Sequence, residues 1–377
     1  MARVVLVHDY LVQGLRGAER VLLEMHELWP EAPIYTLLFD PERMGEPWTT
    51  LDIRTSFLQK LPSSVRLYRK LYLLMPAAVE RLKVEPCDVV VSASSAWVKN
   101  LRPPPGALHV CYCYSPARFL WHQRSEYLSG LGLPGPARAL VGATLVPLRL
   151  WDRRRSHRVN AFIAVSEAVR QRIRRYYGRD AVVVYPPVDV GRFAETPAGD
   201  GSGEYFLVVA ALNPYKRVDL PVRACTRLGL PLKVVGDGLL KSQLQAIAGP
   251  TVEFLGRVSE EELRELYAGC RALLMPQEED FGLVAVEAQA AGKPVVAYRA
   301  GGALEIVREG ETGLFFDAQS PESLEQAIAR LDGMAFSAEA CRSNAARFSS
   351  ERFRREMRET VQYLLGQWRT GKRGVLI

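Results

Sequence analysis

Residues 272–298 have the sequence ALLMPQEEDFGLVAVEAQAAGKPVVAY, and this stretch decides the fold class. A short apolar run at 272–276 predicts a buried strand, and a polar loop follows it. The run GLVAVEAQAA, which begins at Gly282, predicts a helix, and the β-branched run at 294–298 predicts the next strand. A strand, a helix and a second strand in this order indicate one repeat of a parallel sheet with helical crossovers.

The same alternation of short apolar runs and amphipathic stretches extends along the whole chain, so we expect an α/β protein. The runs are too apolar for a sheet with one wet face, and we therefore expect helices on both faces. In the first half, strands are predicted at 3–8, 34–39, 88–94, 107–113, 162–166 and 181–186. In the second half, they are predicted at 205–210, 232–236, 252–256, 272–276, 294–298 and 313–316.

The 377 residues are enough for two domains, and residues 186–205, rich in Pro, Gly and acidic side chains, indicate a linker between them. We expect an N-terminal domain at 1–190 and a C-terminal domain at 200–349, with the boundary near 187–203. Three helical runs follow the last strand, and the final one, at about 350–370, is long enough to cross back onto the first domain. Two doubly wound domains joined in this way would place the carboxyl ends of both sheets around one cleft, where such sheets bind ligands.

Composition narrows the class of protein. No apolar stretch reaches the roughly 18 residues of a membrane span, and the short run after Arg3 lacks the features of a signal peptide. The six cysteines form no CxxC pair, so a disulfide framework and a zinc site are not indicated, and we expect a cytoplasmic protein. The net charge is +7, with +8 in residues 1–200 and −1 in 201–377, which suits an anionic membrane, a phosphate-bearing substrate or nucleic acid.

The loop and helix at 279–287 carry the clearest functional signal. The backbone N–H groups of Phe281, Gly282 and Leu283 would lie at a helix N-terminus, where unpaired donors and the helix dipole favour an anion such as phosphate. Glu279 precedes this position and Glu287 lies about five residues into the helix, so the two carboxylates could hold hydroxyl groups at the two ends of a sugar nucleotide. Alternatively, Glu279 is an ordinary acid at a helix start and Glu287 a solvated helix residue.

The segment PQEEDFGLVAVEAQAAGKPVVAY resembles the E-x7-E signature of the retaining GT-B glycosyltransferases of family 4. Further stretches resemble this family in the expected order, and they cover nearly the whole chain: GLRGAERV, FIAVSEAVRQRI, VVVYPPVDVGRF, LNPYKRVDL, VVGDG, VEFLGRVSEEEL and AGGALEIVREGETGLFF. The resemblance implies the GT-B fold, with two doubly wound parallel-sheet (Rossmann-like) domains that face one cleft. It also implies that the second domain binds a nucleotide sugar and the first binds the acceptor.

The resemblance implies roles for individual residues. Glu279 would contact hydroxyls of the transferred sugar, Phe281, Gly282 and Leu283 would offer N–H groups to the sugar and phosphates, and Glu287 would hold the ribose. Lys216 would neutralise the diphosphate, which develops negative charge as it departs. The remaining donor-site residues implied by the resemblance are Gly14 and Gly17 of a glycine-rich loop, and Arg257 and Val258, which follow Gly256 beside the base.

Two departures from the family pattern concern catalysis. Ala211 stands where relatives have an arginine, so one diphosphate cation is missing unless Arg217 or another residue compensates. Tyr114 stands where relatives have the histidine of His-x-Pro, and its hydroxyl could donate a hydrogen bond to the donor sugar. Tyr114 could instead be a packing residue, and catalysis could be weakened or lost. His8 and Asp9 end the first predicted strand, where they border the cleft or cap a turn.

The resemblance therefore implies a metal-independent hexosyltransferase that acts with retention on a glycan or lipid-linked glycan. Among relatives, HDYLVQGLRGAERV, YPPVD, PYKRVD and QEEDFG look most similar to bacterial mannosyltransferases, which makes GDP-mannose the expected donor. A protein that binds nucleotide sugars with little or no turnover is the alternative. Arginine runs alone, without a nucleic-acid-binding module, do not indicate nucleic acid. The segment 66–74 contains Arg66, Arg69 and Lys70 among Leu and Tyr residues. We expect it to form either a helix that binds to anionic lipid or a helix whose charged face is solvated.

Overall fold

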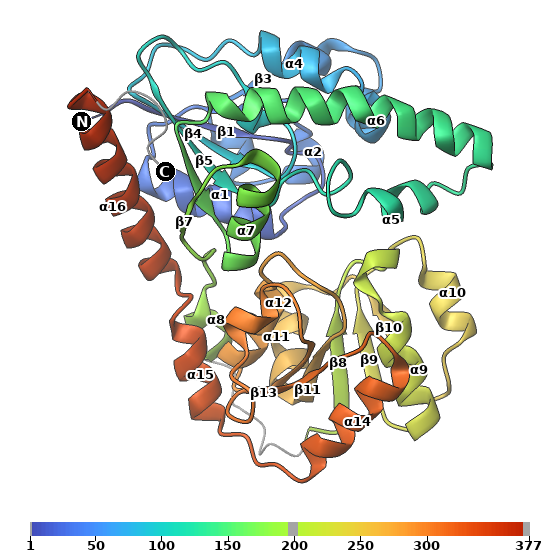
Figure 1. Ribbon diagram of the computed structural model, residues 1–377. Helices are drawn as coiled ribbons and strands as arrows, with labels where there is room; N and C mark the ends of the chain where they lie inside the picture. Colours follow the sequence, from blue (N-terminus) through green and yellow to red (C-terminus); the bar gives the residue numbers. More distant parts are fainter. Residues whose placement is uncertain (1, 195–202, 372–377) are drawn as a thin grey trace. The chain divides into compact units, whose positions relative to one another are not determined.

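The computed structural model describes residues 2–194 and 203–371, which form two compact units (Figure 1). The N-terminal unit consists of residues up to 185 together with the chain from 353 onward, and the C-terminal unit consists of residues 186–352. The predicted linker contributes Pro186 and its neighbours to the C-terminal unit, and residues 195–202 of it lie outside the described residues.

The N-terminal unit contains a seven-stranded parallel sheet in the order β3-β2-β1-β4-β5-β6-β7. Its strands are β1 (Val4–His8), β2 (Ile34–Thr36), β3 (Ile53–Thr55), β4 (Val89–Ser94), β5 (Leu108–Cys113), β6 (Ala161–Ala164) and β7 (Val182–Val183). Its α-helices are α1 (Gly17–Leu28), α2 (Pro41–Met44), α3 (Ser64–Leu67), α4 (Met75–Arg81), α5 (Arg124–Ser129), α6 (Gly135–Arg155), α7 (Glu167–Tyr177) and most of α16 (Ser350–Arg369). Short 3₁₀ helices are η1 (Trp48–Thr50), η2 (Phe57–Lys60), η3 (Tyr68–Leu71), η4 (Val98–Asn100) and η5 (Ser156–Arg158).

The C-terminal unit contains a six-stranded parallel sheet in the order β10-β9-β8-β11-β12-β13. Its strands are β8 (Tyr205–Val209), β9 (Leu232–Val235), β10 (Val252–Gly256), β11 (Cys270–Met275), β12 (Val295–Tyr298) and β13 (Gly313–Phe316). Its helices are α8 (Val190–Ala194), the 3₁₀ helix η6 (Pro214–Lys216), α9 (Asp219–Leu228), α10 (Lys241–Ala246), α11 (Glu260–Gly269), α12 (Leu283–Ala290), α13 (Ala303–Ile306), α14 (Pro321–Asp332) and α15 (Ala338–Ala346).

Both sheets are covered by helices on their two faces (Figure 1), which confirms the prediction of two doubly wound parallel sheets. Central strands such as β4 and β5 are buried over their whole length because each side chain meets a helix on one face or the other. The apolar residues of β8, β9 and β11 pack with those of α9 and α14 into the core of the C-terminal unit.

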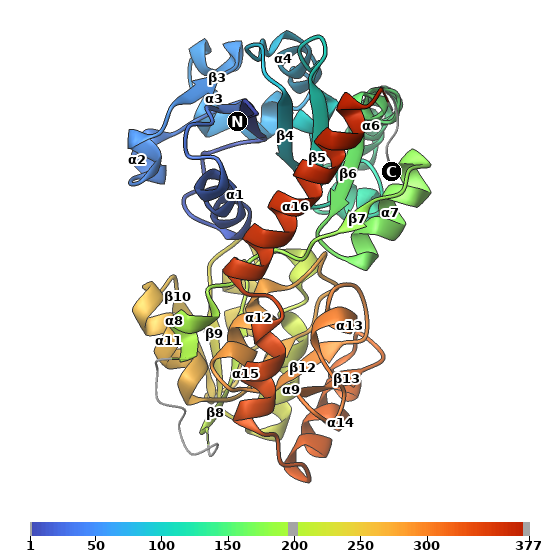
Figure 2. The ribbon, with the colours of Figure 1, turned by 90° about the vertical axis from the view of Figure 1, so that its left-hand side faces the viewer.

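The last helix belongs mainly to the N-terminal unit, where it runs across the sheet (Figure 2). The ring of Phe353 packs edge-on against that of Tyr112 in β5, with 5.7 Å between the ring centres. Near the other end of α16, the indole N–H of Trp368 donates a 2.9 Å hydrogen bond to the carbonyl of Gly106. The chain therefore returns to its first unit after completing the second.

Local differences from the predictions have simple causes. The strands predicted at 34–39 and 181–186 are shorter, and β3 was not predicted, because it is a three-residue edge strand whose residues are all half-buried. The segment 66–74 is not one amphipathic helix. It comprises the end of α3, the 3₁₀ helix η3 and a turn, so the expectation of a continuous helix there is wrong.

Candidate functional site

The candidate site of the C-terminal unit lies where the strand order reverses. Strands β9 and β10 extend from one side of β8, whereas β11 extends from its other side, so the loops after β8 and β11 diverge and leave a crevice at the carboxyl ends. Lys216 lies in η6 after β8, and Glu279 lies in the loop after β11. The structure thus brings together two residues that are 63 positions apart in the sequence.

Lys216 and Glu279 are in direct contact, because the Lys216 ammonium forms an ion pair with Oε1 of Glu279. The side-chain amide of Gln277 donates a 2.9 Å hydrogen bond to the same oxygen. Glu279 is 9% exposed and Gln277 is 2% exposed, so both lie within the crevice rather than on the outer surface. Sequence reasoning missed Gln277, although its position two residues before Glu279 in the same loop could have indicated it.

The first turn of α12 begins directly beside this contact. Gly282 is the N-cap with φ of 106°, a left-handed conformation that an L residue rarely adopts. Phe281 is buried, and its ring packs edge-on against Phe348 at 5.4 Å. Because an α-helix leaves its first N–H groups without partners in the same helix, the donors of Gly282 and Leu283 could form an anion seat beside the ion pair of Lys216 and Glu279.

A second loop holds the anion seat in place. The backbone N–H of Gly302 donates a 2.9 Å hydrogen bond to the carbonyl of Glu279. A Cβ at Gly302 would lie 2.1 Å from the carbonyl oxygen of Phe281, so only glycine allows the two backbones to approach this closely. The double glycine of the motif AGGALEIV is therefore explained by packing against residues 279–281.

Glu287 lies in the fifth position of α12 and has a different partner. The hydroxyl of Tyr267, a fully buried residue of α11, donates a 2.8 Å hydrogen bond to Oε2 of Glu287. Sequence reasoning missed Tyr267, because nothing in the sequence indicates that the end of α11 reaches the middle of α12. The carboxylate of Glu287 is therefore oriented by the protein rather than simply solvated.

The other predicted donor-site residues lie farther from this group. Arg257 and Val258 follow β10, two strands away from β8, and Arg257 is exposed. Arg217, considered as a replacement for the missing cation at Ala211, has φ of 48° and points its guanidinium at the carboxylate of Asp219, with N–O distances of 3.1 and 3.2 Å. Its Nη2 also lies 3.5 Å from the carbonyl of Gln319. Arg217 is thus committed to partners of its own and does not join Lys216.

In the N-terminal unit, the predicted residues gather at the carboxyl ends of β1 and β5. Gly14 lies in the loop after β1, whereas Gly17 is the first residue of α1 and not part of that loop. Tyr114 follows β5, and its hydroxyl donates a 2.9 Å hydrogen bond to the carbonyl of Ala18, next to Gly17. Burial, with neighbouring Tyr112 and Glu19, raises the pKa of Tyr114 well above its usual range, so the hydroxyl stays protonated and acts as a donor.

Three buried polar atoms near Tyr114 have no hydrogen-bond partner in the described part of the chain: Nδ1 of His8, Oε2 of Glu19 and Oγ of Ser115. The rings of His8 and Tyr114 meet edge-on with 6.2 Å between centres. These three residues are at most 7% exposed. Buried polar atoms without partners are costly, and at the carboxyl edge of a parallel sheet they indicate a place for a polar ligand.

Asp9 has a structural role instead. Its carboxylate accepts hydrogen bonds of 2.7 to 2.9 Å from the backbone N–H groups of residues 95–98, and the hydroxyl of Ser95 also donates to it, at 3.1 Å. These bonds tie the end of β1 to the loop after β4, the two strands where the order of this sheet reverses. Of the alternatives considered for Asp9, the structure shows the turn cap.

The described part of the chain contains neither a candidate metal site nor a candidate membrane span. Within residues 2–194 and 203–371, no group of three or more His, Cys, Asp and Glu side chains is arranged to hold a metal ion. None of the helices described is both long and apolar enough to span a bilayer.

Comparison with known families gives two matches that follow one another along the chain. The family described as Glycosyltransferase Family 4 matches residues 15–192, and the family described as Glycosyl transferases group 1 matches residues 194–348. Together the two matches cover every strand of the two sheets except β1, which precedes residue 15.

Individual relatives match over part of their length. An uncharacterized glycosyltransferase of Methanocaldococcus jannaschii is 32% identical over 174 residues, which are 45% of this chain and 48% of that protein. A D-inositol 3-phosphate glycosyltransferase of Corynebacterium urealyticum is 36% identical over 174 residues, which are 43% of this chain and 40% of that protein. The matches thus span less than half the length of these relatives.

Solved structures share the fold at low sequence identity. Sucrose-phosphate synthase of Thermosynechococcus elongatus matches with a TM-score of 0.73 and 17% identity, over 97% of this chain and 99% of that one. Anabaena HepE in complex with UDP and glucose matches with a TM-score of 0.67 and 18% identity, over 96% of this chain and all of that one.

Proposed function

Because the chain belongs to the GT-B glycosyltransferases of family 4, we propose that it transfers a hexose from a nucleotide sugar to a hydroxyl of a glycan or lipid-linked glycan. One observation carries this proposal, namely the ion pair of Lys216 and Glu279 beside the first turn of α12. It gathers one cation, one carboxylate and a helix N-terminus at the reversal point of a doubly wound sheet. A sugar diphosphate needs these three groups for its phosphates and its hydroxyls.

We propose that the donor breaks this ion pair and binds to both of its residues. Its diphosphate binds Lys216 and the N–H groups of Gly282 and Leu283, with Phe281 packed behind them. Glu279, released from Lys216, accepts hydrogen bonds from hydroxyls of the sugar while Gln277 keeps it oriented. Glu287, held by Tyr267, binds the ribose, and Arg257 and Val258 border the base.

In the transfer step, the bond between the anomeric carbon and the phosphate oxygen breaks, and the acceptor oxygen binds that carbon from the same face. The departing phosphate oxygen takes the acceptor proton, so the configuration is retained and no side chain is needed as a base. Lys216 and the dipole of α12 stabilise the negative charge that develops on the leaving diphosphate. In this proposal these groups do the work that a metal ion would otherwise do.

The N-terminal unit is proposed to bind the acceptor. His8, Glu19 and Ser115 offer buried polar atoms without partners, which suit the hydroxyls of a sugar. The hydroxyl of Tyr114 stays protonated and already donates to the carbonyl of Ala18, so it is proposed to accept a hydrogen bond from a ligand hydroxyl. Gly14 and Gly17 leave room for the backbone to approach the donor phosphates.

GDP-mannose is the proposed donor, on the resemblance of four motifs to bacterial mannosyltransferases. A uridine nucleotide sugar is the second candidate donor, since Anabaena HepE, which shares the fold, was solved with UDP and glucose. We also propose a cytoplasmic location and a peripheral contact with anionic membrane through Arg66, Arg69 and Lys70, all three of them exposed. Nucleic acid is not a proposed partner.

The test is a panel of GDP-, UDP-, ADP- and dTDP-sugars in thermal unfolding, since a ligand at a hundred times its Kd stabilises by about 2.7 kcal/mol. We expect stabilisation by one class of nucleotide, and release of that nucleotide when an acceptor is added. A donor that binds without transfer to any acceptor would favour the binding protein without turnover, which Ala211 and the turned-away Arg217 would explain. No stabilisation by any nucleotide sugar would contradict the proposal.

A further inference from the structure

Exposed large apolar side chains concentrate in one part of the N-terminal unit. Fifteen such residues occur in the described chain, and eight of them lie in segments 61–74 and 133–150, namely Leu61, Leu67, Leu73, Leu74, Leu133, Leu140, Val146 and Leu150. On α6, Leu140 is 70% exposed and Val146 and Leu150 are more than half exposed. Scattered apolar residues on a surface are ordinary, but a concentration of this kind marks an interaction site.

The two segments form one continuous surface. The hydroxyl of Tyr72, at the end of segment 61–74, lies 3.0 Å from that of Thr144 in α6. Helix α5 belongs to the same surface, because it packs against α6. The hydroxyl of Tyr72 also lies close to that of Tyr127 in α5, where it adds to the effect of burial in raising the pKa of Tyr127. Figure 1 shows α6 extending alongside α4, with α5 beside its first turns.

The same surface, taken together with α5 and the whole of α6, is strongly basic. Segments 61–74 and 124–155 carry nine Arg and Lys residues and only two acidic ones, Glu126 and Asp152. Asp152 is fully buried in an ion pair with Lys99, so it does not offset the charge at the surface. Apolar and cationic side chains mixed in this way suit the interface of an anionic membrane, where apolar groups enter the acyl region and cations meet phosphates.

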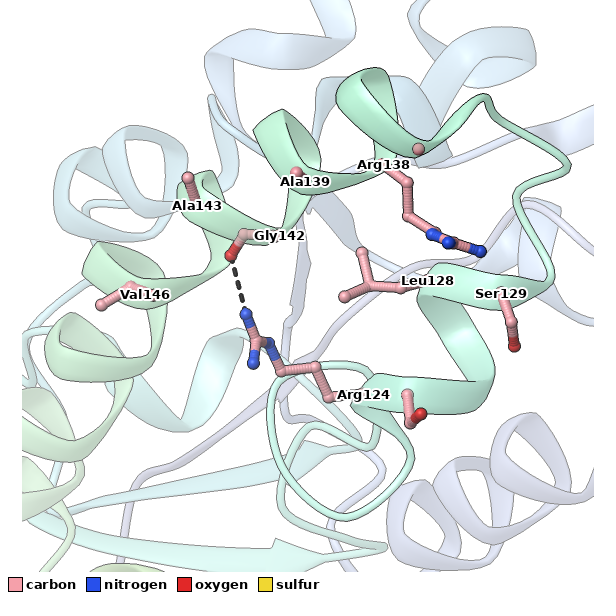
Figure 3. A pocket seen from close by; sticks show the side chains of 10 residues that line it. Arg124, Leu128, Ser129, Arg138, Ala139, Gly142, Ala143 and Val146 are labelled. Atoms are coloured by element: carbon pink, nitrogen blue, oxygen red, sulfur yellow. Dashed lines mark hydrogen bonds between the residues drawn. The ribbon is translucent and has the colours of Figure 1, made fainter.

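A groove of about 580 Å³ lies between α5 and α6 (Figure 3). Arg138 of α6 and Leu128 of α5 extend into the space between the helices, and the Arg124 guanidinium donates a 2.9 Å hydrogen bond to the carbonyl of Gly142. No acidic side chain lines the groove, and Arg138 forms no ion pair with residues 2–194 or 203–371. Two arginines beside apolar walls match a phosphate that carries a hydrocarbon chain.

We propose that the groove between α5 and α6 binds the phosphate of an anionic phospholipid, and that the surface around it docks on the membrane. Leu140, Val146 and Leu150 enter the acyl region, while Arg124 and Arg138 hold the phosphate. The inference rests on the proposed function, since an acceptor carried by a membrane lipid requires the enzyme to reach the bilayer. It adds residues of α5 and α6 that no motif indicated.

The test compares vesicles of phosphatidylcholine with vesicles that also contain phosphatidylglycerol, using cosedimentation of the full chain. Each arginine near an anionic surface contributes about a fivefold gain in partitioning, so Arg138→Gln should lose about fivefold and Arg124→Gln with Arg138→Gln about 25-fold. Leu140→Gln should also weaken binding to the acidic vesicles. The control is Arg355→Gln with Arg358→Gln on α16, two exposed arginines of the same unit, which removes the same charge.

Equal losses in the groove variant and the α16 control would overturn the proposal, because attraction would then follow net charge alone. Unchanged binding of Leu140→Gln, or no binding of the wild type to acidic vesicles, would overturn it as well. Because Arg124 also links α5 to α6, the single variant Arg138→Gln keeps the test valid if the double variant unfolds. Nucleotide-sugar binding is measured on the same samples, so a wild type that binds vesicles but no nucleotide contradicts only the proposed function.

Discussion

The ammonium of Lys216 and the carboxylate of Glu279 form an ion pair between the loops that follow β8 and β11. The pair is largely buried, with side-chain exposures of 16% and 11%. Because the two charges are paired with each other, the proposed donor must replace this ionic contact by its own contacts to Lys216 and Glu279. The two residues should therefore affect different steps of the proposed reaction.

Lys216→Gln should weaken the binding of a nucleoside diphosphate by about 10- to 150-fold, the range for one hydrogen bond to a charged group. Calorimetric titration with the diphosphate and with the matching nucleoside separates the phosphate contribution, because the nucleoside should bind the variant and the wild type equally. Arg223→Gln, which removes an exposed cation from α9, is the control and should leave both affinities unchanged. Equal diphosphate affinity of Lys216→Gln and the wild type would remove Lys216 from the phosphate site.

Glu279→Gln should mainly lower turnover, because the neutral amide still fits the loop but accepts weaker hydrogen bonds from the sugar hydroxyls. Steady-state transfer should show a lower kcat, with donor Kd changed much less. Removal of the negative charge also frees Lys216, so the affinity for the nucleoside diphosphate without its sugar should stay equal or increase. A fall in that affinity with unchanged kcat would reverse the assignment of the two roles.

Glu287→Ala should weaken nucleotide binding through the ribose. The sharpest comparison uses the nucleoside diphosphate and its 2′,3′-dideoxy analogue, because only the first offers hydroxyls to the carboxylate. We expect Glu287→Ala to abolish the preference for the hydroxylated ligand. Tyr267→Phe, which removes the 2.8 Å hydrogen bond that orients Glu287, should reduce this preference without abolishing it. A preference that survives in Glu287→Ala would exclude a ribose contact.

The sequence predicted the fold well because the buried strands are short, continuous apolar runs. It was less accurate at the sheet edges, where β3 is too short and too exposed to leave an apolar pattern and the strand predicted at 181–186 is reduced to the two residues of β7. The loop and helix at 279–287 could be predicted because they are contiguous in the chain.

The partners of those residues were not predictable, since Tyr267 lies 20 positions before Glu287 and comes close only through the packing of α11 on α12. Arg217 shows the same limit. Its place beside Lys216 in the sequence suggested a second phosphate cation, but the left-handed backbone at Arg217 and the nearby Asp219 turn it elsewhere. Contacts of this kind depend on three-dimensional packing that sequence spacing does not encode.

Buried His109 should make the stability of the N-terminal unit depend on pH. Burial lowers its pKa to about 4, and its Nε2 lies 2.8 Å from the Ser92 hydroxyl while Nδ1 lies 3.2 Å from the carbonyl of Arg158. Well above pH 6.5, both the native and the unfolded states hold neutral histidine. As the pH falls from about 6.5 towards 4, only the unfolded state takes up the proton, so the free energy of unfolding decreases, by about 2 kcal/mol at pH 5.

Urea unfolding at pH 7.5 and pH 5 measures this effect. His109→Gln lowers stability at both pH values but should lose about 2 kcal/mol less than the wild type between them. Parallel decreases in the two proteins would show that other groups cause the pH dependence.

Tyr114 offers a test of whether the N-terminal unit takes part in the proposed reaction. Its hydroxyl donates to the carbonyl of Ala18 in the first turn of α1, so it fixes the residues that follow the Gly14 loop. Tyr114→Phe should lower turnover about two- to tenfold, which is the effect of losing one neutral hydrogen bond, and should leave nucleotide binding intact.

Tyr112→Phe is the matched control. Tyr112 lies in β5, two residues before Tyr114, and its hydroxyl donates a 3.0 Å hydrogen bond to the carbonyl of Val184. Both variants should lose similar stability, but only Tyr114→Phe should lose activity, whereas Tyr114→His should keep or raise it. Equal turnover in Tyr114→Phe and Tyr112→Phe would show that Tyr114 is a packing residue with no part in transfer.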